Sequence, residues 1–148
     1  MKRVALMLAL GASTLCAAQT FPERPIQMVV PFGPGGTTDI MARLLADELG
    51  RQLGGSVVVV NTAGAGGSIG MGNVARAKPD GHTISMTTVG PLAIQPAHQL
   101  RPLVSLSDTP ALGFENVPTA KQIGLPVRGT VWGGLVAPQR PARRSAQQ

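Results

Sequence analysis

Hydrophobic positions in the first half of the chain follow two alternating patterns, which predict strands and helices in turn. Short apolar runs at residues 24–30, 56–61 and 82–89 are rich in the β-branched residues that strands favour. Residues 37–55 instead carry apolar side chains at helical spacing, and residues 68–77 show a weaker helical pattern. The apolar positions of the longer helix are Ile40, Met41, Leu44, Leu45, Leu49 and Leu53. We therefore expect the order β-α-β-α-β.

Some finer details of these elements follow from residue type. The run SVVVVN at residues 56–61 is continuous, which is typical of a strand covered on both faces in a parallel sheet. Asp47 and Arg51 are four residues apart and are expected to form an ion pair on the polar face of the helix. The sequence KPDG predicts a turn in which Gly81 takes a positive φ.

The second half of the chain has a weaker pattern and many prolines. We expect a strand at residues 100–107, interrupted by Pro102, and a second strand at residues 129–138. Residues 117–124 fit one or two helical turns, and residues 139–148 have the composition of a disordered tail.

The chain starts with a sequence typical of a secretory signal peptide. Lys2 and Arg3 precede an apolar run from Val4 to about Ala12, and small residues follow, so we expect cleavage after Ala18. A lipoprotein signal at Cys16 and an uncleaved core segment are the alternatives. Cleavage would remove the only cysteine, which leaves no disulfide and no cysteine metal site in the mature chain.

The net charge of +6 comes from the two ends of the chain. Of 13 Lys and Arg residues, five are Lys2, Arg3, Arg140, Arg143 and Arg144, and the other eight face seven acidic residues. A nearly neutral body with only 3% aromatic residues argues against nucleic-acid binding. Two histidines without clustered acids or thiols give no metal signal, and we expect no cofactor.

Two glycine-rich loops follow the first two strands. The first reads FGPGGTTD and the second lies at residues 62–72. Because the carboxyl ends of parallel strands share one edge of the sheet, both loops are expected at the edge where ligands bind in α/β folds. Backbone N–H groups at a helix start suit an anion such as a carboxylate or phosphate. Ordinary turns that need small residues remain the simplest alternative.

The patterns of known nucleotide sites and of hydrolases do not fit these loops. A Walker loop needs Lys after its glycines, whereas Thr37 follows Gly36. The motif GMGNVA at residues 70–75 starts too far from the strand for a dinucleotide fold, so a Rossmann-type nucleotide-binding protein is a distant alternative. Ser68 lacks the frame of a hydrolase nucleophile.

The series of motifs from residue 21 to residue 84 resembles one receptor family closely. The matching stretches are the lead-in RP, then VPFGPGGTTD, VVVVNTAGAGGSIG and ARAKPDGHT. They resemble Bug-type proteins, the extracytoplasmic solute receptors of tripartite tricarboxylate transporters. The resemblance implies a type II periplasmic-binding-protein fold, in which two α/β lobes close over a small carboxylated solute. That solute would be a tricarboxylate, dicarboxylate, amino acid or aromatic acid, and the receptor would catalyse nothing.

The resemblance also implies a periplasmic location, the membrane components of the transporter as partners, and a set of binding residues. The loops would hold one carboxylate of the solute through backbone N–H groups. Asp39 is expected to serve the helix start rather than touch the ligand, whereas Asn61 fits a turn role and a site role equally. The implied binding residues are Phe32, Gly33, Pro34, Gly35, Gly36, Thr37, Thr38, Asp39, Asn61, Gly64, Ala65, Gly66, Gly67, Ser68, Thr87 and Thr88.

The later part of the chain resembles a segment that lies much further along in these receptors. We expect the α/β fold to be a partial one, mainly the first lobe with a β-α-β-α-β open parallel sheet. The expected division is a signal peptide at 1–18, the first lobe at 19–98, a remnant of the later segment at 99–138 and a tail at 139–148. Loss of one lobe would weaken solute binding roughly a thousandfold. A non-functional remnant of such a receptor is the alternative function.

Overall fold

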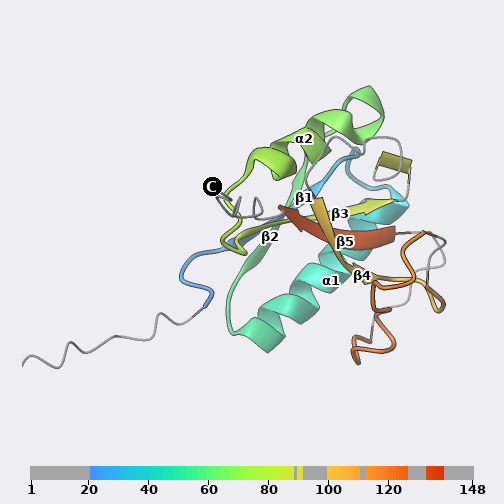
Figure 1. The fold of residues 1–148 in the computed structure, drawn as a ribbon. Coiled ribbons are helices and arrows are strands. Elements are labelled where there is room, and N and C mark those ends of the chain that lie inside the picture. The colour runs from blue at the N-terminus through green and yellow to red at the C-terminus, as the bar shows by residue number, and fades with distance from the viewer. Residues whose placement is uncertain (1–20, 89, 92–99, 111–112, 127–132, 139–148) are drawn as a thin grey trace, which may run out of the picture.

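In the computed structural model the chain forms one five-stranded sheet with a helix on each face (Figure 1). It describes residues 21–88, 90–91, 100–110, 113–126 and 133–138. The expected signal peptide and C-terminal tail lie outside these residues. Within them, no helix combines the length and the apolar character needed to cross a membrane.

The sheet contains strands β1 (Ile26–Val30), β2 (Val57–Asn61), β3 (Thr83–Thr88), β4 (Leu100–Ser105) and β5 (Gly133–Pro138). Their order across the sheet is β2-β1-β3-β5-β4. Strand β1 is parallel to β2 and to β3, whereas β5 is antiparallel to both β3 and β4. The expected α/β class and the parallel β-α-β-α-β unit are therefore confirmed, and the later segment adds two strands to the same sheet.

Helix α1 (Thr37–Leu53) packs on one face of the sheet and ends at Gly54, whose φ is 63°. Leu45 is fully buried, as expected, but Ile40 and Leu44 are 52% and 55% exposed. The buried positions are instead Ala42 and, one turn later, Ala46. Their small side chains allow the helix to approach the strands closely. The hydrophobic core contains Ile26, Met28, Val30, Ala42, Leu45, Ala46, Ile84, Met86, Val104, Leu106, Ala120 and Leu135.

Helix α2 (Ser68–Arg76) covers the opposite face and follows the short 3₁₀ helix η1 (Ala65–Gly67). Met71 and Val74 are fully buried there. Ser85 on β3 points to the same side, and its hydroxyl donates to the backbone carbonyl of β1 and contacts the sulfur of Met71. The weak helical pattern at residues 68–77 is thus confirmed as a helix.

Strand β2 corrects the expectation of a strand covered on both faces. It lies at the edge of the sheet, and Val58 is 47% exposed. Helix α2 packs mainly against β1, β3 and β5, so it leaves the outer face of β2 open. A continuous run of valines indicates a strand but does not determine its place in the sheet.

The expected ion pair between Asp47 and Arg51 is wrong. The Arg51 guanidinium lies 2.5 Å from the carboxylate of Glu48, and its Nε donates to the backbone carbonyl of Asp47 at 3.4 Å. Residues three apart are neighbours on a helix surface just as residues four apart are, so Glu48 competes for the same cation.

The second half of the described chain is mostly turns around β4 and β5. Strand β4 is confirmed, with a register shift between Pro102 and Val104 where the proline cannot donate to the ladder. The expected helical turns at residues 117–124 are reduced to hydrogen-bonded turns, in which the Ile123 N–H donates to the Thr119 carbonyl. Gly81 has a φ of 86°, as the turn before β3 requires.

Candidate functional site

The first glycine loop lies at the carboxyl edge of β1 and leads directly into α1. Its residues from Gly33 to Thr37 are exposed. Gly35 has a φ of 81°, a conformation that glycine adopts at little cost. Gly36 caps the helix without a side-chain hydrogen bond, so the N–H groups of the first turn have no side-chain cap. This geometry leaves backbone donors and the positive end of the helix dipole at the surface.

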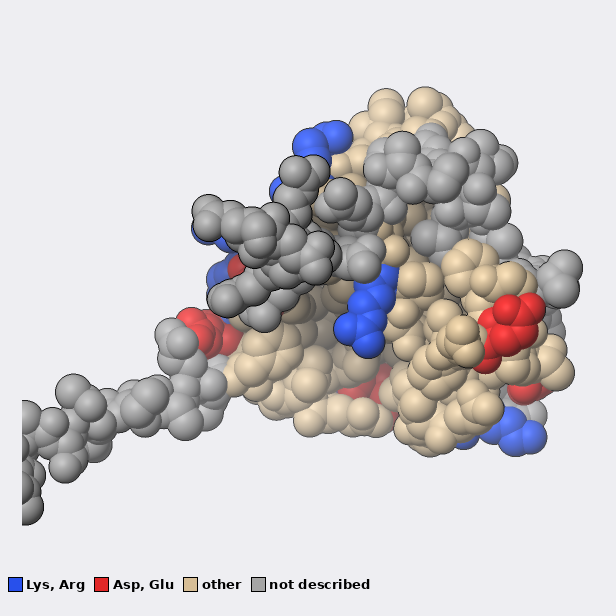
Figure 2. Space-filling view, viewed as in Figure 1, with Lys and Arg blue, Asp and Glu red and all other residues tan. Residues whose placement is uncertain are grey.

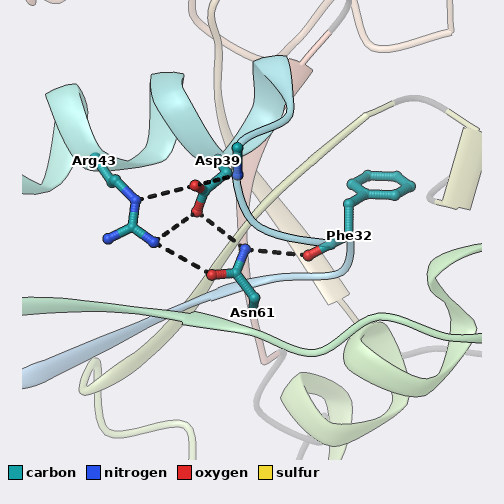
Figure 3. A network of polar contacts seen from close by, with 5 residues as sticks. Phe32, Asp39, Arg43 and Asn61 are labelled. Atoms are coloured by element: carbon teal, nitrogen blue, oxygen red, sulfur yellow. Dashed lines mark hydrogen bonds and ion pairs between the residues drawn. The ribbon is translucent and has the colours of Figure 1, made fainter.

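Behind the loop, a buried carboxylate collects hydrogen bonds from three directions (Figure 3). Asp39 is 3% exposed, and it accepts from the Gly35 N–H at 2.9 Å. The Arg43 guanidinium donates to both of its oxygens at 3.0 Å, and the Asn61 amide donates to Oδ1 at 3.0 Å. The same amide nitrogen donates to the Phe32 carbonyl at 3.1 Å. The network joins the loop that follows β1, the first turns of α1 and the end of β2.

These donors hold the pKa of Asp39 down to about 2, with the hydrogen bond from Arg43 as the largest cause and those from Gly35 and Asn61 next. The carboxylate is therefore ionised at neutral pH. Sequence reasoning singled out Asp39 and Asn61 but missed Arg43. The available signal was its position four residues after Asp39, the spacing at which helical ion pairs form.

The second glycine loop has a different construction. Gly64, Ala65, Gly66 and Gly67 have φ angles of 138°, 47°, 63° and 95°. Four consecutive positive φ values make a tight reversal, and Ala65 is the one non-glycine among the described residues to adopt such a φ. Its shape therefore depends on the backbone freedom of these residues.

Close packing then fixes this loop against the first strand. A Cβ on Gly70 would lie 2.7 Å from the Thr62 carbonyl oxygen and 3.0 Å from the Cα of Pro31. A Cβ on Gly67 would lie 3.0 Å from the Pro91 ring. A side chain at Gly70 would press on backbone atoms, and the φ of 95° at Gly67 is one that other residues rarely adopt, so the start of α2 strongly favours glycine at both positions.

Three of the sequence-predicted residues meet in a small hollow between α1 and β3. Thr37, Thr38 and Thr88 line it, while the residues of the second loop do not. Its volume is about 10 Å³, which is the room of about one water molecule. The other lining residues are Met41, Met86, Leu106 and Gly133. Thr87 is buried, and its hydroxyl donates to the Thr88 carbonyl at 3.3 Å.

Charged side chains do not gather at one place on the face shown in Figure 2, where basic and acidic groups are scattered. The described residues contain no group of three or more His, Cys, Asp and Glu side chains placed to hold a metal ion.

Comparison with known sequences identifies the family. Residues 41–103 match the family described as the tripartite tricarboxylate transporter family receptor. The chain is 51% identical to the protein BugT of Bordetella pertussis over 85 residues, which are 57% of this chain and 26% of BugT. It is 38% identical to a UPF0065 protein of the same organism over 121 residues, which are 80% of this chain and 37% of that protein.

Solved structures agree with the fold. A Rhodopseudomonas palustris protein solved with adipate is 34% identical, with a TM-score of 0.54 over 61% of this chain and 33% of its own. MatC from the same organism, solved with malate, has a TM-score of 0.54 at 20% identity, over 80% of this chain and 79% of its own, and supports the fold alone.

The chain spans roughly a quarter to somewhat over a third of the length of the curated relatives it matches. Over that span the family model and the sequence matches point to the same group of proteins. In the part that is matched, the chain is that of a tripartite tricarboxylate transporter family receptor.

Proposed function

We propose that this chain binds small carboxylated solutes outside the cytoplasm, as one lobe of a receptor for a tripartite tricarboxylate transporter, and that it is not an enzyme. The observation that carries the proposal is the uncapped start of α1 in an exposed glycine loop, in a chain of this family. The relative solved with adipate, at 34% identity, supports a carboxylate as the ligand class. Export and contact with the transporter's membrane components belong to the same proposal.

In this proposal the solute carboxylate lies over the first turn of α1 and accepts hydrogen bonds from backbone N–H groups of Gly36, Thr37 and Thr38. Asp39 does not touch the solute, since its oxygens already accept from Gly35, Arg43 and Asn61 and its charge would repel a carboxylate. Its role, with Asn61, is to hold the loop in place.

The second loop and the end of β3 form the sides of this site. The proposed contacts there are backbone N–H groups of residues 64–68 and the Thr88 hydroxyl, with Thr87 behind it. In this proposal residues 19–98 form the first lobe and residues 99–138 are the remnant of the later receptor segment. Strands β4 and β5 nevertheless pair in the same sheet as β1, so both parts contribute to one lobe.

A second candidate is a remnant that keeps this fold without useful binding. The small size of the hollow at the α1 start favours it, because a volume of about 10 Å³ cannot enclose a dicarboxylate. A solute would then be held from one side only, and water would compete for every donor. We therefore expect dissociation constants in the millimolar range, roughly a thousandfold weaker than a closed two-lobed site would give.

Backbone contact can be tested with a proline at the first position of α1. Proline is tolerated at that position because the N–H it removes has no partner within the helix. Gly36 has φ −78° and ψ 167°, which suits a residue before proline. We expect Thr37→Pro to weaken binding of adipate, malate, citrate or glutamate about tenfold or more, since a hydrogen bond to a charged group contributes roughly 1.5–3 kcal/mol. Two-dimensional NMR titration of the chain from residue 19 onward measures this.

Thr37→Ala is the matched control, because it removes the same side chain and keeps the N–H. Binding lost in the proline variant and kept in the alanine variant supports the backbone site. Equal loss in both variants would assign the contact to the Thr37 hydroxyl instead. No chemical-shift change with any of the four acids would leave the remnant as the better description.

A further inference from the structure

The two outer edges of the sheet differ in how they are protected. An edge strand presents unpaired N–H and C=O groups, and charged side chains, prolines and bulges discourage a further strand from joining it. Strand β4 has all three features, because it contains Arg101, Pro102 and a register shift directly after the proline. An isolated parallel bridge between Ser105 and Thr119 also covers the end of β4. The β4 edge is therefore closed to a further strand.

Strand β2, at the other edge, has none of these features (Figure 1). It reads VVVVN, and its pairing with β1 runs without a register shift. Between Arg51 and Arg76 the sequence contains no charged residue and no proline. Val58 is 47% exposed, on the face of β2 that α2 leaves open. This edge is apolar and uncharged, and it is the type that a further strand joins.

The backbone groups of β2 alternate in direction. The Ser56 carbonyl accepts a hydrogen bond from β1, and the Thr62 N–H donates one to β1, each at 2.8 Å. Every second residue of a strand bonds to a given neighbour, so the even-numbered residues from Ser56 to Thr62 bond to β1. Val57, Val59 and Asn61 therefore direct their N–H and C=O groups away from β1, on the side where the described chain places no strand.

We propose that β2 pairs with β2 of a second copy of this chain, antiparallel and around a two-fold axis, so that the two sheets become one. With the axis at Val59, this residue faces its own copy, and Val57 faces Asn61 of the other copy. The residues of each such pair exchange both of their N–H···O=C hydrogen bonds. Val58 then lies opposite Val60 of the other copy, in the positions where side chains approach most closely. The exposed valine is thereby covered.

Helix α1 determines what else meets across this axis. It packs on β2, β1 and β3, so it extends from the β2 edge inward over the sheet. The Arg43 guanidinium donates to the Asn61 side chain at 3.4 Å, and the Gly50 carbonyl accepts from the Gly55 N–H at 3.2 Å. These contacts lie near the two ends of β2. An axis through Val59 therefore passes the stretch of α1 between Arg43 and Gly50.

Charges on that stretch are complementary in a two-fold arrangement. Asp47 lies one turn after Arg43 on the same side of α1, and no ion pair within the described residues involves it. The axis sets the two α1 helices antiparallel, so Arg43 of each copy lies towards Asp47 of the other. Since β2 itself brings no like charges together, the surface suits a second copy better than a charged strand of another protein.

The pairing uses the open edge of both copies, and β4 does not offer another. The expected product is therefore a closed dimer and not a growing chain of molecules. A pair of five-residue strands is a small interface, so we expect a dissociation constant in the micromolar range. The two solute sites are not part of this interface. The dimer is therefore expected whether or not the chain binds a carboxylated solute.

Sedimentation equilibrium of the full chain, expressed from its first residue, measures the dimer. Val58→Lys and Leu103→Lys introduce the same charge at the two edges, at side chains that are 47% and 38% exposed. We expect Val58→Lys to raise the dissociation constant about tenfold or more, because the lysine would be brought against Val60 of the other copy. Leu103→Lys is the matched control on β4 and should leave the dissociation constant unchanged.

A proline tests the backbone hydrogen bonds. Val59→Pro removes an N–H that points away from β1 and leaves the ladder between β1 and β2 intact. Val59→Ala shortens the same side chain and keeps the N–H. We expect the dimer to weaken about tenfold or more in the proline variant and less than about threefold in the alanine variant. Circular dichroism checks the fold of each variant, and if the proline variant does not fold, the two lysine variants decide.

Four results would overturn the proposal. The wild-type chain could remain monomeric at hundreds of micromolar, or Val58→Lys could leave a dimer unchanged. Loss of the dimer with Leu103→Lys would assign the interface to β4. Growth beyond the dimer would require a second open edge, which contradicts the closed arrangement.

Discussion

The two glycine loops lie at the same edge of one sheet and have similar composition, yet different interactions hold them. The first is held by side chains: Asp39, Arg43 and Asn61 connect the loop to α1 and to the neighbouring strand. The second is held by its unusual backbone conformation and by the close packing of Gly67 and Gly70. Glycine therefore has a different structural role in each loop.

The difference lies in what each glycine does. In the first loop, glycines leave the backbone uncovered, and a Cβ on Gly33 or Gly35 would meet nothing within 4 Å. In the second loop, Gly70 allows two backbone segments to touch, and Gly67 packs against the ring of Pro91. Exposure of donors is what a ligand site needs, whereas close contact is what a rigid support needs. The comparison predicts different responses to substitution.

The largest effect is expected at Gly70. Alanine there would place a Cβ 2.7 Å from the Thr62 carbonyl oxygen, and backbone on both sides must move. We expect Gly70→Ala to lower the free energy of unfolding by about 3 kcal/mol in urea denaturation. Gly66→Ala is the control for conformation without contact, because its φ is 63° but the space beside it is open; it should cost about 1 kcal/mol. Equal costs in both variants would mean that packing does not distinguish this loop.

Asn61 is next in size, because it holds the first loop. Asn61→Ala removes the donor to the Phe32 carbonyl and to Asp39, and it leaves a carbonyl with one partner fewer. We expect a loss of about 1–2 kcal/mol in unfolding free energy. Amide hydrogen exchange should also speed up at residues 33–38 and stay unchanged at residues 64–68. Faster exchange in both loops would show that the two are not held independently.

Acid should loosen the first loop more than the second. The pKa of Asp39 is about 2, below the ordinary value of about 4, so its carboxylate stabilises the folded state above pH 4. That stabilisation is lost as the pH falls from about 4 through about 2. Asp39→Asn should be less stable at pH 7 and show a flatter decline in this window.

A variant of Arg43 tests the cause of the lowered pKa of Asp39. The Arg43 hydrogen bond is the largest cause of the lowered pKa, so Arg43→Met should raise the pKa of Asp39 toward its ordinary value. The carboxyl ¹³C shift of Asp39, followed by NMR against pH, measures this directly. An unchanged titration of Asp39 in that variant would mean that the hydrogen bonds from Gly35 and Asn61, and not Arg43, lower its pKa.

The smallest effect is expected at Gly33. Its φ is not positive and no atom lies within 4 Å of a Cβ placed there, so Gly33→Ala should change the unfolding free energy by less than about 0.5 kcal/mol. A cost above 1 kcal/mol would show that the first loop also depends on close packing, and the contrast with Gly70 would disappear.

Local patterns in the sequence were sufficient for β1, α1, β2, α2 and β3. Each has a periodic or continuous apolar run, and a right-handed parallel arrangement is the usual outcome of such an order. The position of both loops at one sheet edge followed from that arrangement. The exposed Ile40 and Val58 did not, because exposure depends on which element packs on a given surface. A single sequence does not contain that information in its periodicity.

For the candidate site, too, some features could be predicted from the sequence and others could not. Residue types alone identified the glycine loops, Asp39 and Asn61, since uncovered backbone and a carboxylate near a helix start leave a sequence signature. The spacing of Asp39 and Arg43 was a local signal, but the contact of Arg43 with Asn61 and the separation of Ser68 from the hollow needed the folded chain. They depend on distances between elements that are far apart in sequence.

By itself, the sequence determined the α/β class, the elements of residues 21–88 and the family, because these depend on local propensity and on a long series of motifs. Only the tertiary structure decided that β5 and β4 extend the same sheet, with β5 antiparallel to both β3 and β4. The physical reason is that hydrogen bonding across a sheet and burial between layers join residues distant in the chain. Their partners are chosen by the whole fold and not by neighbouring residues.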